Sequence, residues 1–394
     1  MTSQAGPTGL TERALGPDLA RGFMLLFIAL ANSHYFVNGP SIFGGFPTDG
    51  SVVDRAVAFL IATFVDGRSF PMFGVLFGYG VAQIVRRQRE AGKEWRPIRK
   101  LLRRRSLVLV VLGFLHAMLL YVGDILAAYG VLLFLGVWAL RWKDRWLFIV
   151  AAFMLVLSSL PSGDSLSTAT DPVDPSMLPQ NLLDQYADRI VVQPFIALLG
   201  PIGFIAPFLI GLWAGRRRVL EHPAEHRTLL WSTAIIGITV AVVGALPVSL
   251  VVGGVIGRPS DHTLSIIGPL HDSSGVLGGF GYAALIVLIG MRLSDRQGRG
   301  TLAIAAVGQR SLTCYLAQSV VWTVVFTPYL LDLSDTLSTT TTALLAIVTW
   351  LATVLLAERM RRAGYRGPFE ILIRKFTYQP STAATRSRSS GRRA

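Results

Sequence analysis

The amino-acid sequence predicts an all-α fold: a polytopic integral membrane helical bundle with about ten transmembrane helices and both termini in the cytoplasm. Composition is the first indication, since 52% of the 394 residues are hydrophobic, only 15% are charged and the mean hydropathy is +0.52. The second is a series of apolar runs of about 17–25 residues, the length of a transmembrane helix, without the alternation of a barrel strand. The third is that cationic residues gather in alternate loops.

The predicted spans form a single transmembrane domain over residues 19–378. Each span is judged by its length and its lack of charge. The second is short and contains Pro71, and the eighth contains Pro269, His271 and Asp272, so we expect the eighth to be broken or re-entrant. In chain order the spans are residues 19–38, 69–85, 105–121, 124–140, 145–161, 192–215, 228–252, 264–291, 302–327 and 340–357.

The distribution of charge predicts the orientation of the bundle. Residues 1–18 are expected to form a cytoplasmic N-terminal segment, which places the basic loop at about 86–105 inside and the long acidic loop at about 162–191 outside. Residues 379–394 predict a disordered, basic cytoplasmic tail. This positive-inside pattern accounts for most of the net charge of +14, so nucleic acid is not needed as a partner and membrane lipids are expected instead.

Several chemistries lack their sequence signals. The chain contains no HExxH, GxSxG or Walker motif. Cys314 is the single cysteine and the six histidines are scattered, so neither an intramolecular disulfide nor a metal site is expected. The remaining candidates are polar side chains inside the spans, because placing them in hydrocarbon is costly.

The strongest candidates lie in the segment LGFLHAMLLYVGDILAAYG, residues 112–130. A neutral His116 in the outer half of its span can act as a general base or take up an acyl group, and Asp124 can orient its ring and stabilise its cation. Eight residues of regular helix would separate the two by about 12 Å, so direct contact is not assured. Tyr129 is a plausible second neighbour. The alternative is a structural histidine bonded to a backbone carbonyl, with Asp124 as a helix cap.

Other polar residues are candidates for binding a substrate or donor. Arg21 and Asn32 lie eleven residues apart and share one face of the first span, where Arg21 can meet a phosphate at the cytoplasmic mouth. Arg68 at an outer end can hold an anionic group, and Gln318 is deep enough to need a partner. The alternatives are interfacial arginines and hydrogen bonds that join helices.

These segments resemble the YeiB-type family, a bacterial membrane family labelled as a domain of unknown function. The resemblance covers nearly the whole chain, and its most specific part is the block from His116 to Gly130. The motifs that carry it are RG followed by an apolar run to Asn (Arg21 to Asn32), FxxLFGxG (Phe73 to Gly80), LHxxLxxxGDIL with AYG (Leu115 to Gly130), VGxxxLTxYLxQS (Val307 to Ser319) and GPxE (Gly367 to Glu370).

That family is grouped by similarity with transmembrane acyltransferases such as heparan-α-glucosaminide N-acetyltransferase and the acyltransferase-three family. The resemblance implies a multi-pass protein of the bacterial plasma (inner) membrane. It also implies transfer of an acyl group from cytoplasmic acyl-CoA to an unknown cell-envelope or small-molecule acceptor at the outer face, with no bound cofactor. The acyltransferase-three group has a histidine where this chain has Asn32, which leaves His116, supported by Asp124, as the better catalytic candidate.

Two other classes of function stay open at this stage. One is a transporter or lipid-linked export factor, in which the same polar residues line a permeation path or relay protons. The other is a non-catalytic scaffold, in which they only join helices. A tunnel from the basic mouth near Arg21 to His116 favours the enzyme, a midplane cavity that alternates between faces favours the transporter, and closely packed helices without a cavity favour the scaffold. The sequence leaves the oligomeric state open, homo-oligomers included.

Overall fold

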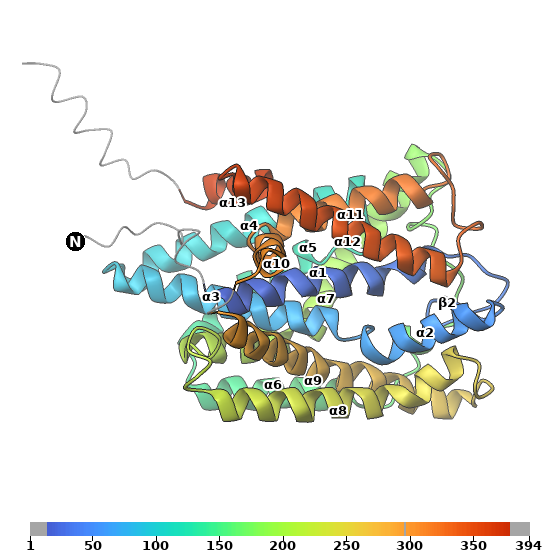
Figure 1. Ribbon diagram of the computed structural model, residues 1–394, viewed down its shortest axis with the longest axis horizontal. Helices are drawn as coiled ribbons and strands as arrows, with labels where there is room; N and C mark the ends of the chain where they lie inside the picture. The colour runs from blue at the N-terminus through green and yellow to red at the C-terminus, as the bar shows by residue number, and fades with distance from the viewer. Residues whose placement is uncertain (1–13, 295–296, 379–394) are drawn as a thin grey trace, which may run out of the picture.

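The computed structural model describes residues 14–294 and 297–378. Most of the predicted N-terminal segment and all of the predicted tail at 379–394 therefore lie outside the described residues. The described chain folds into helices packed side by side along one long axis (Figure 1). The α-helices are α1 (Leu15–Ser33), α2 (Val52–Phe64), α3 (Ser69–Glu90), α4 (Trp95–Leu119), α5 (Leu126–Gly136), α6 (Asp144–Ser158), α7 (Leu182–Arg216), α8 (Arg227–Val252), α9 (Asp261–Leu293), α10 (Arg299–Gln309), α11 (Ser311–Phe326), α12 (Thr339–Arg362) and α13 (Pro368–Thr377).

Short elements complete the described chain. One is a hairpin of two-residue strands, β1 (Ile42–Phe43) and β2 (Phe46–Pro47), which pair antiparallel. The others are three 3₁₀ turns, η1 (His34–Phe36), η2 (Trp138–Arg141) and η3 (Leu166–Thr168). The predicted all-helical class is therefore correct.

Six segments in the described chain are long and apolar enough to cross a membrane as helices. They are Leu15–Phe36, Val52–Glu90, Leu182–Arg216, Arg227–Val252, Asp261–Leu293 and Thr339–Arg362. Two shorter apolar helices, α5 and α11, fall within the predicted fourth and ninth spans. The count of about ten spans is thus not established by helix length and composition.

Two predicted spans differ from their expected shape. The eighth is not broken, because α9 continues through Pro269. Proline removes the N–H that would bond to the carbonyl of Ser265, and that carbonyl accepts instead from Ser162 N at 2.8 Å. The ninth is divided at Arg310 into α10 and α11, and Arg310 donates across the break to the carbonyl of Tyr365 at 2.6 and 3.0 Å.

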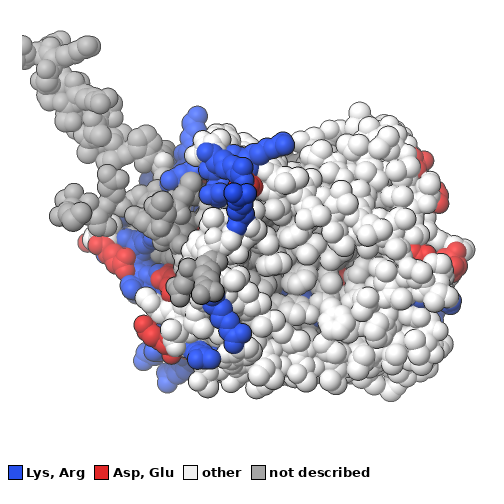
Figure 2. Space-filling model, viewed as in Figure 1, with Lys and Arg blue, Asp and Glu red and all other residues white. Residues whose placement is uncertain are grey.

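Charged side chains are separated along the long axis. Figure 2 shows Lys and Arg gathered at the end where α4 begins and α13 lies, which we call the basic end, and a broad face without charge beyond it. Some acidic side chains lie among these cations, but in the same view the charged side chains at the opposite end are mostly acidic, and we call it the acidic end. Between the two ends α4 packs on α5, α3 on α7 and α8 on α9.

Candidate functional site

His116 and Asp124 form a buried, hydrogen-bonded pair. His116 Nδ1 lies 2.8 Å from Asp124 Oδ1, and the two residues are 3% and 0% exposed. The expected separation of about 12 Å was wrong, because it assumed two regular helices. In the structure α4 ends at Leu119 and the chain turns back before α5 begins at Leu126. Asp124 Oδ2 also accepts from Ala127 N at 2.8 Å, so the carboxylate caps α5 as well as holding the imidazole.

A glycine on α4 makes this pairing sterically possible. Gly113 lies three residues before His116, on the same side of the helix. A Cβ at position 113 would lie 2.2 Å from Ala127 N and 2.4 Å from Asp124 Oδ2. Only a residue without a side chain lets the turn before α5 approach α4 this closely.

The second ring nitrogen of His116 is buried, and no described residue forms a hydrogen bond with it. When Nδ1 donates to the carboxylate, Nε2 carries the lone pair, and in the described part of the chain Nε2 has no hydrogen-bond partner. Gln318 on α11 is 1% exposed, and both polar atoms of its side chain lack a partner among the described residues. Its predicted need for a partner is thus not met within these residues.

Tyr315 is a neighbour of His116 that the sequence reasoning missed. Its ring centroid lies 5.0 Å from that of the imidazole, closer than Tyr121 at 6.5 Å. The signal was present in the YLxQS pattern, because Tyr315 stands one helical turn before Gln318 and so shares its face. Tyr129, the predicted neighbour, instead donates to the carbonyl of Phe70 at 2.9 Å and stacks on Phe204 at 4.6 Å.

A cavity of about 280 Å³ enters the bundle from the basic end. Its polar lining includes five arginines: Arg21, Arg87, Arg105, Arg366 and Arg374. Its apolar lining comes from α1, α3, α4, α5 and α11, and includes Ile28, Phe73, Leu126 and Tyr315. His116 does not line the cavity, but its neighbour Tyr315 does. The predicted position of Arg21 at a basic mouth is consistent with this arrangement.

Glu370 on α13 is the carboxylate at the cavity mouth. It accepts from Leu312 N at 2.9 Å and Thr313 N at 3.1 Å, and so caps the start of α11. The Thr313 hydroxyl also donates to it. Burial raises the pKa of the Glu370 carboxyl, although these hydrogen bonds act to lower it. Arg21, which also lines the cavity, contacts the Asp18 carboxylate at 3.3 Å and the carbonyl of Leu76 at 3.4 Å.

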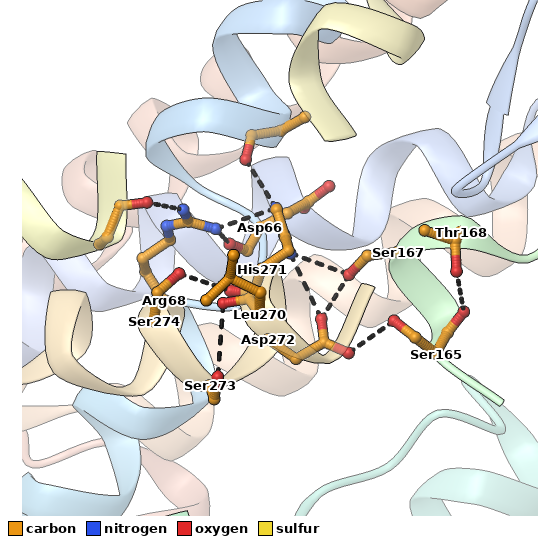
Figure 3. Close-up of polar contacts among 12 residues, drawn as sticks. Asp66, Arg68, Ser165, Ser167, Thr168, Leu270, His271, Asp272, Ser273 and Ser274 are labelled. Atoms are coloured by element: carbon orange, nitrogen blue, oxygen red, sulfur yellow. Dashed lines mark hydrogen bonds and ion pairs between the residues drawn. The ribbon is translucent and has the colours of Figure 1, made fainter. Parts of the chain in front are cut away.

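Arg68 belongs to a second polar cluster, toward the acidic end, and not to the surroundings of His116 (Figure 3). It is 0% exposed and donates to the carbonyls of Asp66 and Ala241, the latter at 2.7 Å. Its Nη1 lies 3.1 Å from His271 Nε2. Arg68 is therefore enclosed by α2, α3, α8 and α9, and of the two alternatives that the sequence left open, an arginine that only marks the interface does not fit this burial.

The same cluster extends to η3, in the loop before α7, and to the end of α1. Asp272 lies 3.3 Å from His271 Nδ1 and accepts from Ser165 at 2.7 Å and from Ser167. His34 is 0% exposed and lies 3.5 Å from Asp66. Asn32, two residues earlier on α1, is half-buried. The structure thus brings together His116 with Asp124, and separately Arg68 with His271 and Asp272.

Fold and site together define a helical membrane protein with an ionisable pair buried between two of its helices. Residues 214–380 match the family described as "Protein of unknown function (DUF418)". The chain is 26% identical to "Uncharacterized protein YxaH" of Bacillus subtilis over 411 aligned positions, which cover 95% of this chain and 97% of the relative. It is also 26% identical to "Uncharacterized protein YeiB" of Escherichia coli over 402 positions, 95% and 98% of the two chains. The YeiB-type resemblance is thereby confirmed over nearly the whole chain.

Proposed function

We propose that the protein is a membrane-embedded acyltransferase, which moves an acyl group from cytoplasmic acyl-CoA to a hydroxyl or amine presented at the outer face of the bacterial plasma membrane. The observation that carries the proposal is the cavity at the basic end. It is lined by arginines and, on α1, α3 and α5, by apolar side chains, and it reaches Tyr315 beside the His116 ring. Acyl-CoA has matching parts, since its phosphates suit guanidinium groups and its acyl chain suits apolar walls.

The chemistry assigned to the pair is general base catalysis. His116 Nε2 takes the proton of the acceptor hydroxyl or amine as that group attacks the thioester carbonyl carbon. The carbon–sulfur bond then breaks, and the leaving sulfur takes the proton back as the thiol of CoA. Asp124 holds the ring through Nδ1 and stabilises the imidazolium that forms between these steps.

The membrane arrangement is part of the proposal. We infer about ten spans, with the N-terminus and C-terminus in the cytoplasm, so that the basic end faces the cytoplasm, where acyl-CoA is found. The separation of charge in Figure 2 supports this orientation, because loops rich in Lys and Arg stay on the cytoplasmic side.

Donor binding is the first test of this function. Purified protein in detergent is titrated with radiolabelled acetyl-CoA and with longer acyl-CoAs. We expect saturable binding, weakened about ten-fold in Arg105→Gln and Arg374→Gln and weakened in Arg21→Ala. Binding should be unchanged in His116→Gln, and also in Arg227→Gln, which removes an exposed cation that does not line the cavity. The absence of binding by folded wild-type protein would refute the acyl-CoA mechanism.

A specific observation favours a transporter as the second candidate. The cluster toward the acidic end connects His34, Asp66, Arg68, His271 and Asp272 in one series of contacts, and the Asp272 side chain is 38% exposed. Such series of ionisable groups relay protons in membrane transporters. Proton uptake into proteoliposomes that depends on His271 and Asp272 and proceeds without acyl-CoA would support transport over acyl transfer.

A further inference from the structure

The first turns of α4 carry a row of cations on one face. Arg96, Arg99, Lys100, Arg103 and Arg104 recur at helical spacing and line one groove. Among the described residues, none of the five forms an ion pair or hydrogen bond through its side chain. No carboxylate is found among the described residues that line the groove. The groove therefore concentrates positive charge that the described chain does not neutralise.

The same helix face becomes apolar one turn later. Leu107 and Val110 continue the row on α4, and Phe134 and Leu135 on α5 and Leu198 on α7 line the rest of the groove, whose volume is about 860 Å³. Three of these side chains are strongly exposed: Leu107 at 63%, Leu135 at 61% and Leu198 at 64%. Exposed leucines directly beside cations fit the boundary between lipid headgroups and acyl chains.

Aromatic rings contact two of the guanidinium groups, and they lie at the same level of the helix bundle as the cations. The Cζ of Arg99 lies 5.8 Å from the ring centroid of Trp138, and the Cζ of Arg103 lies 5.2 Å from that of Phe134. Trp138 is itself 50% exposed, as tryptophans at a membrane interface commonly are.

We propose that this groove is a specific binding site for an anionic phospholipid that carries two phosphates, a lipid of the cardiolipin type. From Arg96 to Arg104 the cations extend over about 12 Å of helix axis, whereas one phosphate engages donors within about 3 Å of its oxygens. Two linked phosphates use the whole row, and the acyl chains lie on Leu107, Leu135 and Leu198. The site is distinct from the cavity of the proposed acyltransferase, to which α4 contributes Arg105 and Leu109 instead.

The test uses the full chain, delipidated in detergent, with native mass spectrometry to count bound lipid. The triple variant Arg96→Gln, Lys100→Gln, Arg104→Gln removes three cations of the row. The control triple Lys93→Gln, Arg227→Gln, Arg359→Gln removes the same charge from exposed positions outside the groove. Size-exclusion profiles and lipid-free melting temperatures establish that both variants fold.

We expect one cardiolipin-type lipid per chain, bound at least about ten-fold more tightly than a phospholipid with one phosphate at equal total charge. The groove triple should weaken this binding about ten-fold or more, and the control triple less than about two-fold. Equal losses in both triples would show a general charge effect and overturn the proposal. Equal affinity for the lipid with one phosphate would overturn the two-phosphate assignment.

Discussion

Gly113→Ala perturbs the proposed site without replacing either member of the His116–Asp124 pair. The added methyl would lie 2.2 Å from Ala127 N and 2.4 Å from Asp124 Oδ2. The backbone atom cannot rotate away, so the start of α5 has to move from α4. That movement lengthens both the hydrogen bond from Ala127 N to Asp124 and the contact of Asp124 with His116.

The expected cost is the sum of two effects. Inserting a methyl into a tightly packed contact destabilises by about 1–3 kcal/mol. Loss of the helix cap that Asp124 provides costs about 1 kcal/mol more. We therefore expect Gly113→Ala to lower the free energy of unfolding by about 2–4 kcal/mol.

Thermal and denaturant unfolding in detergent, followed by tryptophan fluorescence, measures this loss. The matched control is Gly203→Ala, another helical glycine, where a Cβ meets no described atom within 4 Å. That variant should be neutral or gain about 0.5–1 kcal/mol from helix propensity. If Gly113→Ala were as stable as Gly203→Ala, the close approach that positions Asp124 would be refuted.

Three further predictions concern other parts of the molecule. Arg68→Ala should lower the free energy of unfolding by about 3–5 kcal/mol, because it leaves buried partners unpaired, while the affinity for acyl-CoA stays within about two-fold. The control Arg258→Ala removes an exposed ion pair and should cost about 1 kcal/mol or less. Equal losses in the two variants would contradict the burial of Arg68. Burial raises the pKa of the Glu370 carboxyl above its ordinary 4.5, so the folded protein favours the protonated carboxyl. The stability that this carboxyl contributes is therefore fully present below pH 4.5 and should be lost as the pH rises through the raised pKa. Melting temperatures of wild type should therefore fall more steeply with pH than those of Glu370→Gln, and parallel curves would exclude this effect. Finally, an impermeant thiol reagent should label Ser162→Cys in intact cells but Lys93→Cys only after permeabilisation, and the reverse pattern would invert the proposed orientation.

Much of the architecture could be predicted from the sequence because it depends on local patterns. Apolar runs without charge identified the long helices α8, α9 and α12 to within about five residues at each end, and they identified α7 except for its first ten residues. Asp124 was also predicted as a helix cap, and it accepts from Ala127 N. Such features need only the neighbouring residues, and the sequence displays those directly.

The remaining features depend on tertiary contacts that no local pattern contains. The contact between His116 and Asp124 depends on where α4 stops and on the space at Gly113. The carbonyl that Pro269 leaves without a donor in α9 accepts instead from the N–H of the distant residue Ser162. Arg68 looked like an interfacial cation, because its partners on α8 and α9 follow it by more than 170 residues.

The most direct test of the proposed enzyme is a single-turnover measurement of CoA release. Wild type and His116→Gln are loaded with acyl-CoA and mixed with candidate hydroxyl and amine acceptors, and the freed CoA thiol is read with a thiol reagent. The background is low, because the single cysteine, Cys314, is 0% exposed. We predict that both proteins bind the donor equally and that wild type releases CoA at least about 100-fold faster, within the range assigned to general base catalysis. Equal rates in the two folded proteins would contradict the catalytic role of His116.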